Sequence, residues 1–407
     1  MNRHIQGKGS RRAPRCVLWA LLIGAAAHPE VTSGATHLVP EEYATIQAAI
    51  DAAAVGDTVL IGPGTYRGEG NREIELRGRD IVVTSRTGPE DTIIDCEYAG
   101  RGFFIHERET RAARVVGLTI THGATAPGDP GGSLGAGIAC SLSSPTISDC
   151  CIYECYSFSD GGGLGFVVFE GVVERCLIAG CYAERGGGVW VQVGESEIRD
   201  CVITGNFAQD GGGICFGGTG PNRLFGSTVA ANFAVFGGGI LAANPLLLDK
   251  CVVWDNCTFG GDGDEIWCGR SEIRCSDIDR TGVYSGYPVG YDEYCIFTNP
   301  LFCRGVSCGQ TTDGDWQLDA ASPCLPQHSP CGELIGALGQ GCGGTAPTGA
   351  CCFPDGSCRV LEQAACGDEH GSYMGDDTIC DPNPCHTNPT ETTTWGRLKE
   401  AYRSSRL

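Results

Sequence analysis

Basic residues are scarce in this chain of 407 residues. Twenty-eight lysines and arginines stand against 49 aspartates and glutamates, which leaves a formal net charge of −21. Lysine itself occurs only at positions 8, 250 and 399. Because neutralising phosphates takes clustered cations, this composition argues against nucleic acid as a partner. The acidity suits solubility outside the cell or calcium binding, and a solvated acidic surface explains it equally well.

Long apolar segments are missing as well. The longest, "CVLWALLIGAAA" (Cys16–Ala27), follows a basic leader and is too short to span a bilayer. It fits the apolar region of a signal peptide, and the small residues of "SGA" at 33–35 suit cleavage before Thr36. We therefore expect residues 1–35 to be a signal peptide, with no transmembrane segment after its removal. The expected location is secreted, extracellular or on the cell surface.

Cysteine, by contrast, is abundant, with 26 in the chain and 25 after the leader. In an exported protein many of these should be oxidised to disulfides. An odd count leaves at least one thiol unpaired unless the protein dimerises.

A short unit recurs along the middle of the chain. The segments "CYAERGGGV", "NFAQDGGGI" and "NFAVFGGGI" follow one another at nearly constant spacing. Their glycine triplets, with the variants on either side, begin at positions 135, 161, 186, 211, 237 and 263, which is a period of 25 or 26 residues. A fixed period of this length is typical of solenoids.

Other residues fall into columns once the glycines are aligned. Two columns are aliphatic, one is mostly cysteine, and one changes from cysteine to asparagine. They are Ile147, Val173, Ile198, Leu224, Leu248; Ile152, Ile178, Ile203, Val229, Val253; Cys150, Cys176, Cys201, Ser227, Cys251; and Cys155, Cys181, Asn206, Asn232, Asn256.

This pattern predicts an all-β solenoid, specifically a right-handed parallel β-helix. Each unit has several short apolar stretches without helical period, so it buries its apolar face only by stacking on its neighbours. Three short strands per turn would convert every column into a ladder along the axis. The leucine-rich repeat, the alternative solenoid of this period, lacks support because the L-x-x-L-x-L pattern is missing.

The charged residues test the register independently. Neighbouring rungs lie about 4.8 Å apart, so outward charges in one column become neighbours. The alignment places Arg175 between Asp149 and Asp200, and Glu174 beside Arg199. We therefore interpret the repeated glycines and asparagines as parts of the scaffold before considering them as a functional site. Glycine suits tight turns with positive φ, and asparagine amides can form hydrogen bonds along a ladder.

Both ends of the solenoid have features of their own. Upstream, Tyr43–Arg67 predicts a helix followed by a strand, with Thr45 as the helix N-cap. Ile46, Ala49, Ile50 and Ala53 would form its apolar face and cover the open end of the β-helix.

The chain resembles a known class of proteins in three segments. They are "ATIQAAIDAA" with "GDTVLIGPGTYR", the rungs of the form C-V-I-T-G-N-x-A-x-x-GGGI, and "NPLFC", "GDWQLDAASPC" and "LIGALGQGC" near the end. They are similar to bacterial secreted right-handed β-helix repeat proteins of the pectin-lyase-like superfamily. The GGGI and Asn-Phe elements also resemble repeats of chlamydial polymorphic outer membrane proteins. The resemblance covers residues 36–342 and implies the fold more than an activity, because the superfamily mixes lyases, hydrolases and adhesins.

A compact cysteine-rich module is expected at residues 349–385. Its six cysteines are Cys351, Cys352, Cys358, Cys366, Cys380 and Cys385. Because so short a segment cannot hold itself together by apolar burial, we expect three disulfides, with the pairing open among 15 options. A zinc site is the competing hypothesis, and residues 386–407 are expected to form a linker and a basic tail.

Chemistry is harder to locate. Asp262, Asp264 and Glu265 in "GGDGDE" form the best cluster of hard oxygen ligands and would suit calcium as a possible cofactor. His122 stands alone in "THG", before the longer excursion "GATAPGDPGGSL". Within the 25-residue units we expect the cysteine column to hold packed thiols, and residues 257–342 to hold disulfides in outer loops.

Our leading functional hypothesis is a non-catalytic protein that binds an extracellular glycan or a cell-surface protein along its face. The alternative is a polysaccharide lyase or glycoside hydrolase, and a structural spacer is a third. The resemblance implies that an enzyme would bring carboxylates and an arginine together on one sheet. A binding protein would instead align exposed aromatics such as Trp190, Phe207 or Phe233 along the axis.

Overall fold

The computed structural model describes residues 34–385 except residues 130, 219, 260–262, 307, 309–313, 344–347, 354–355, 363–365, 367–370, 375–379 and 381–384. The expected signal peptide, apart from residues 34 and 35, lies outside the described residues, as do the tail at 386–407 and Asp262. The chain divides into two compact units, Met1–Gly339 and Gln340–Leu407.

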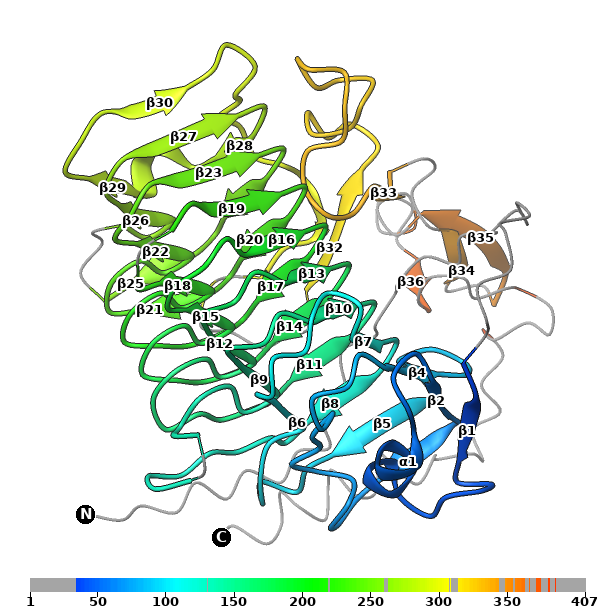
Figure 1. Ribbon diagram of the computed structural model, residues 1–407. Helices are drawn as coiled ribbons and strands as arrows, with labels where there is room; N and C mark the ends of the chain where they lie inside the picture. Colours follow the sequence, from blue (N-terminus) through cyan, green and yellow to red (C-terminus); the bar gives the residue numbers. More distant parts are fainter. Residues whose placement is uncertain are drawn as a thin grey trace, which may run out of the picture. The chain divides into compact units, whose positions relative to one another are not determined.

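Three parallel sheets run along the first unit (Figure 1). In the described part of the chain, sheet A has eleven strands: β1 (Thr36–Val39), β2 (Thr58–Ile61), β4 (Val82–Ser85), β7 (Arg114–Val116), β10 (Thr146–Ser148), β13 (Val172–Glu174), β16 (Glu197–Arg199), β19 (Asn222–Phe225), β23 (Leu246–Asp249), β27 (Ser271–Arg274) and β30 (Val289–Tyr291). Sheet B comprises β3 (Gly64–Tyr66), β5 (Thr92–Asp95), β8 (Thr119–Thr121), β11 (Cys151–Tyr153), β14 (Leu177–Ala179), β17 (Val202–Thr204), β20 (Thr228–Ala230), β24 (Val252–Trp254) and β28 (Asp277–Ile278). Sheet C comprises β6 (Phe103–Ile105), β9 (Ile138–Ser141), β12 (Leu164–Val167), β15 (Val189–Val191), β18 (Ile214–Phe216), β22 (Ile240–Ala242), β26 (Ile266–Cys268) and β29 (Val283–Ser285).

From β4 to β29 each turn of the chain contributes one strand to each of the three sheets, so the chain forms a parallel β-helix. The register follows the sequence period, with Ile147 paired to Val173 in sheet A and Ile152 paired to Ile178 in sheet B. The aliphatic columns are fully buried in one continuous core. Stacking therefore buries the apolar face that a single unit cannot bury alone, and the predicted solenoid is confirmed.

The glycine column forms the tight turn before sheet C. Gly161 has a φ of 66°, and a Cβ at this position would lie 2.2 Å from the carbonyl oxygen of Leu164. A side chain is therefore excluded by both conformation and space, which gives the repeat a structural cause.

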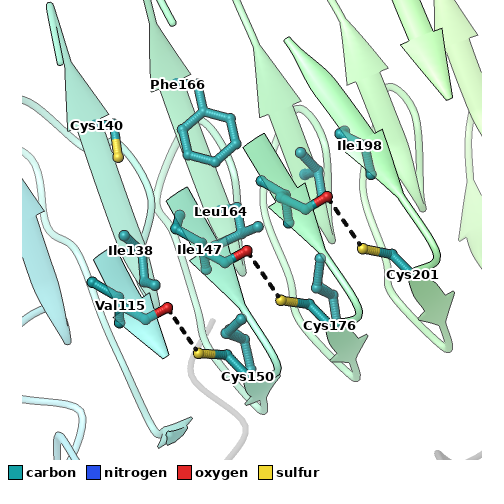
Figure 2. Packing of buried hydrophobic residues seen from close by; sticks show 14 of the residues in the cluster. Val115, Ile138, Cys140, Ile147, Cys150, Leu164, Phe166, Cys176, Ile198 and Cys201 are labelled. Carbon is teal, nitrogen blue, oxygen red and sulfur yellow. Dashed lines mark hydrogen bonds between the residues drawn. The ribbon is translucent and has the colours of Figure 1, made fainter. Parts of the chain in front are cut away.

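The cysteine column holds buried thiols, as expected from its place between aliphatic ladders (Figure 2). The Sγ of Cys150 donates to the carbonyl of Ser148 at 3.2 Å and lies 3.7 Å from the carbonyl of Val115 on the preceding rung. Cys176 repeats this arrangement with the carbonyls of Glu174 and Ile147. Burial raises the pKa of the Cys150 and Cys176 thiols well above its ordinary value.

The outward charges pair as the alignment predicts in two of the three cases. Arg175 makes two 2.8 Å contacts with the carboxylate of Asp149 on the preceding rung. Arg199 bonds Glu174 in the same way, with its Nε 2.8 Å from Oε2. A direct contact between Arg175 and Asp200 is not among the ion pairs of the described residues.

The N-terminal end of the β-helix is covered by helix α1 (Ile46–Ala52), as predicted. The Thr45 side chain caps it by accepting from the Ala48 N–H. Ile46, Ala49 and Ile50 are fully buried and join the main core. The helix thereby closes the apolar interior where stacking stops.

The described residues of a later segment, 292–306, 308 and 314–339, include parts that pack back onto the outer face of sheet B. The segment includes β31 (Phe302–Arg304) paired antiparallel with β32 (Asp315–Asp319). Trp316 packs against Val202 and Ala230, and Leu318 and Ile335 pack near Val252. The later rungs of this face are therefore covered.

Short elements complete the first unit: β21 (Phe233–Ala234) pairs with β25 (Cys257–Thr258), and η1 spans Arg280–Gly282. Disulfides Cys257–Cys308 and Cys275–Cys331 confirm the expected bridges in the 257–342 region. Cys268, Cys295 and Cys324 nevertheless remain thiols there.

The second unit contains β33 (Gln340–Cys342), β34 (Thr348–Cys352), β35 (Cys358–Glu362) and β36 (Ser372–Tyr373). Its six predicted cysteines form three disulfides, Cys351–Cys366, Cys352–Cys385 and Cys358–Cys380. This selects one pairing from the 15. The sulfurs of Cys352, Cys358 and Cys385 lie within 4.8 Å of one another, but each is engaged in a disulfide rather than offered as a zinc ligand.

Candidate functional site

Four polar side chains from consecutive rungs form one connected row on sheet B, which we call the polar line: Arg67, Asp95, His122 and Glu154. The Nε of Arg67 donates to Oδ2 of Asp95 at 2.9 Å, and Asp95 Oδ1 lies 2.8 Å from Nδ1 of His122. On its other side, Nε2 of His122 lies 3.3 Å from Oε2 of Glu154. The imidazole thus links two carboxylates that are 27 and 32 residues away in the sequence.

The parallel register assembles this line. Asp95 ends β5, and pairs with Thr121, the last residue of β8. His122 and Glu154 directly follow β8 and β11, whose last residues are also paired. Both occupy the left-handed region, with φ of 54° and 53°, at the corner where the chain leaves sheet B. Equivalent corners on stacked rungs place these side chains beside one another.

The electrostatics of the line favour an ionised Asp95. Burial alone would raise the pKa of Asp95, but hydrogen bonds from His122 and Arg67 outweigh it and hold the pKa below its usual value. Arg72 and Glu97 form a second ion pair nearby, at 2.8 Å. Carboxylates, a guanidinium and an imidazole can together accept and donate hydrogen bonds or move a proton.

Aromatic rings form a second row directly beyond the polar line, which we call the aromatic ladder. Its members are Tyr156, Tyr182, Phe207, Phe233 and Phe259. Successive ring centroids lie 5.0 to 5.2 Å apart, and the first four rings are nearly parallel. Because stacked rings cover one another's faces, the ladder presents ring edges and tyrosine hydroxyls to solvent.

The aromatic ladder begins on the rung where the polar line ends. Tyr156 follows Glu154 by two residues. Tyr98 is 57% exposed and rests against His122, with ring centroids 4.9 Å apart. The two rows therefore form one strip of polar and aromatic side chains.

A charged column lies next to the ladder, three or four residues further along each turn. Its members Asp160, Arg185 and Asp210 are paired by backbone bridges. Arg185 binds Asp160, with Nη2 2.9 Å from Oδ2.

Phe207 and Phe233 are aligned along the axis as expected, but only Phe207 is exposed, Phe233 is half-buried, and the expectation is wrong for Trp190. Phe207 is 36% exposed, whereas Trp190 is only 3% exposed. Arg185 lies over the Trp190 ring at 5.3 Å, and this ring packs with Cys215. Sheet C places Trp190 on its outer face, but neighbouring side chains cover it there.

The predicted calcium ligands have other partners. Glu265 is buried and accepts from the backbone N–H of Asn256 at 3.2 Å, so it ends the asparagine ladder instead of facing a turn. Oδ1 of Asp264 accepts from both the backbone N–H and hydroxyl of Thr258. Since Asp262 is outside the described residues, calcium stays a prediction.

One further group of ligand-type side chains occurs on the first rungs of the described chain. Glu75, His106 and Glu107 bring ligand atoms within 4.8 Å of one another. Arg77 also pairs with Glu75, so this group already has a cation.

The sequence singled out His122 but missed Arg67, Asp95 and Glu154. The available signal was weak: each residue stands at or just after the end of a sheet B strand, but their spacings of 28, 27 and 32 residues depart from the 25-residue period. The early rungs lack the glycine triplets, and their irregular lengths conceal the alignment.

Comparison with known proteins settles the hand of the solenoid. Residues 69–229 match the family model described as "Right handed beta helix region". The solenoid is a right-handed parallel β-helix. Among the described residues of this β-helix protein, no helix is both long and apolar enough to cross a membrane.

Solved structures with a related fold include pectate lyase Pel9A, at 13% identity and a TM-score of 0.37, covering 72% of this chain and 90% of that one. Another is a pectin methylesterase from carrot, at 14% identity and a TM-score of 0.33, covering 71% and 87%. A third is a rice weevil pectin methyl esterase, at 14% identity and a TM-score of 0.32, covering 78% and 90%. No curated protein matches the chain. At these values the likenesses carry no argument about activity.

Proposed function

We propose that this chain is an extracellular, non-catalytic β-helix protein of the pectin-lyase-like superfamily that binds a polysaccharide. The observation that carries the proposal is the strip, in which the polar line ends at Glu154, the aromatic ladder begins two residues later at Tyr156, and Tyr98 rests against His122. The strip runs along the solenoid axis on successive rungs, which suits an extended polymer whose own units repeat.

The chemistry of the strip matches that of a sugar chain. Sugar hydroxyls both donate and accept hydrogen bonds, and the carboxylates of Asp95 and Glu154 accept while Arg67 donates. Tyr98, Tyr156 and Tyr182 combine an apolar ring with a hydroxyl, which is the amphipathic character that carbohydrate surfaces also have. Described parts of the segment 292–339 cover later rungs of sheet B but pack away from the polar line.

Extracellular location is part of the proposal. The disulfides of both units are typical of an oxidising compartment, and the expected signal peptide would direct the chain there. A cell-surface protein as partner is the alternative that remains if none of the polysaccharides is retained.

The test is retention on a panel of immobilised polysaccharides, followed by affinity measurement with the polymer retained. We expect the double variant Tyr182→Ala/Phe207→Ala and the single variant His122→Ala each to lose about tenfold or more in affinity. Tyr287→Ser is the matched control, because Tyr287 is 62% exposed but follows β29, away from the strip. Equal loss in the control, or retention by none of the polymers, would refute the proposal.

A second function is favoured by one specific observation, the contact of His122 with two carboxylates and the arginine behind them. This is the convergence expected of a polysaccharide lyase or glycoside hydrolase. Incubation with the same panel, with calcium and with a chelator, followed by mass spectrometry of the products, distinguishes the two. Fragments that disappear in Glu154→Gln would establish an enzyme, whereas intact polymer throughout supports binding alone.

A further inference from the structure

We propose that the polysaccharide bound by this strip is uncharged and that polyuronates are rejected. This inference rests on the proposed function and narrows it to a class of polymer. It follows from how the charges of the strip are paired.

Arg67 in the strip, Arg72 near it and Arg185 in the charged column beside it each have a carboxylate partner already. Arg67 is bonded to Asp95 and Arg72 to Glu97, each with a shortest contact of 2.8 Å. Arg185 is bonded to Asp160 in the charged column, with a shortest contact of 2.6 Å. A uronate that approached one of these guanidiniums would also meet the protein carboxylate bonded to it, which offsets the positive charge that would otherwise attract the uronate.

Carboxylates outnumber the arginines on the same surface. Besides the three that pair with arginine, Glu154 faces only the imidazole of His122 in the polar line. Asp210 continues the charged column beyond Arg185, as the next residue in its bridge ladder. The chain as a whole has a formal net charge of −21, so its long-range electrostatic field also repels anions.

Rung spacing makes the repulsion cumulative. Rungs lie about 4.8 Å apart, and the screening length is about 10 Å at 0.1 M salt. Each charge of a bound polyuronate would therefore meet carboxylates from more than one rung. A neutral polymer meets no such penalty, because its hydroxyls donate to those same carboxylates.

The test uses matched pairs of polymers. Each backbone of the panel is offered in its 6-hydroxyl form and in its 6-carboxylate form, so only the charge differs. Affinities are measured by isothermal titration at about 20, 150 and 500 mM NaCl. We expect the 6-hydroxyl form to bind at least tenfold more tightly at the lowest salt, and the gap to narrow as salt rises.

A charge variant tests the cause. Asp210→Asn removes one carboxylate beside the ladder and should reduce the preference for the neutral form severalfold at low salt. Gln209→Ala, an exposed neighbour without charge, is the control and should leave the preference unchanged.

The outcomes separate the two proposals. Equal or tighter binding of a carboxylate form overturns the inference and leaves glycan binding standing. Binding of neither form of any backbone overturns both. If the preference for the neutral form changes neither with salt concentration nor in Asp210→Asn, the inference is also overturned, because charge would then not cause the preference.

Discussion

The side-chain amide of Asn206 donates to Oδ1 of Asn232 on the next rung at 2.9 Å, and the same oxygen accepts the backbone N–H of Asn206 at 3.0 Å. Asn232 makes the equivalent pair of bonds to Asn256. Both residues are essentially buried, so the ladder satisfies polar groups that water does not reach.

Asn232→Ala should therefore be strongly destabilising. The substitution removes an acceptor from two donors of Asn206 and a donor from the carbonyl of Ile203, which leaves buried groups unpaired. We expect a loss of about 2–4 kcal/mol in the free energy of unfolding, measured by guanidinium denaturation. Gln209→Ala, at an exposed side chain on the preceding turn, should change it by less than about 0.5 kcal/mol. Similar losses for both would show that the ladder is not a special source of stability.

The last rung of the ladder should make stability depend on pH. Burial raises the pKa of Glu265 well above its ordinary value, against the opposing hydrogen bonds from Asn256. The folded state therefore favours the protonated acid, so its contribution is complete below about pH 4 and declines as the pH rises above the unfolded pKa of about 4.3.

Glu265→Gln isolates this effect. The amide oxygen of glutamine can accept both bonds from Asn256, as Oδ1 of Asn256 does for Asn232. We expect the variant to gain stability relative to the natural chain as the pH rises from 4 to 8, in urea titrations at each pH. Glu195→Gln, at an exposed position, supplies the baseline. A constant difference between Glu265→Gln and the natural chain over this range would contradict the assignment.

The buried thiols should be silent until the protein unfolds. Burial raises the pKa of Cys251 to about 12 and that of Cys176 well above its usual value, so neither supplies a thiolate near neutral pH. We expect iodoacetamide to leave Cys150, Cys176 and Cys251 unmodified in the native protein and to label all three in denaturant, as read by peptide mass spectrometry. Labelling of these cysteines in native conditions would show that the core opens.

Serine should replace a ladder cysteine better than alanine does. Ser227 occupies this column naturally and donates to the carbonyl of Phe225 at 2.8 Å, which parallels the Cys201 contact with Arg199. Cys176→Ser should therefore keep the hydrogen bond and cost about 1 kcal/mol in unfolding free energy, with a larger loss for Cys176→Ala. Thermal denaturation of both variants gives the order, and the reverse order would refute it.

The outward ion pairs should contribute more to the choice of strand register than to the free energy of unfolding. Arg175 and Asp149 are each more than a third exposed, so solvent screens their attraction to about 0.5 kcal/mol. Arg175→Asp places like charges on adjacent rungs and should destabilise by about 1 kcal/mol or more, and the swap Asp149→Arg/Arg175→Asp should recover the part that comes from the Asp149 contact but not the bond of Arg175 to Glu174. A double-mutant cycle at low and high salt measures it. No recovery in the swap would mean that the contact contributes through packing.

Residue types in the repeat determined most of the fold. The glycine triplets form a turn that only glycine tolerates, as Gly161 illustrates. The aliphatic columns can be buried only if successive units stack on one another. The period alone therefore predicted sheets, register, buried thiols and the Arg175–Asp149 contact. The cap helix followed from its own apolar face and N-cap.

Only the tertiary structure assembled the candidate site. Asp95, His122 and Glu154 are remote in sequence, and they meet because three rungs of unequal length stack corner on corner. The local sequence likewise does not determine whether an outward side chain is exposed. Trp190 and Phe207 both point away from the core, but Arg185 covers Trp190 whereas Phe207 stays at the surface. The pairing of Cys257 with Cys308 and of Cys275 with Cys331 was also decided by the tertiary structure. These cysteines are 51 and 56 residues apart in the sequence and become neighbours only when the chain has folded. Periodicity is local information, whereas contacts between rungs depend on loop lengths and on what packs over them.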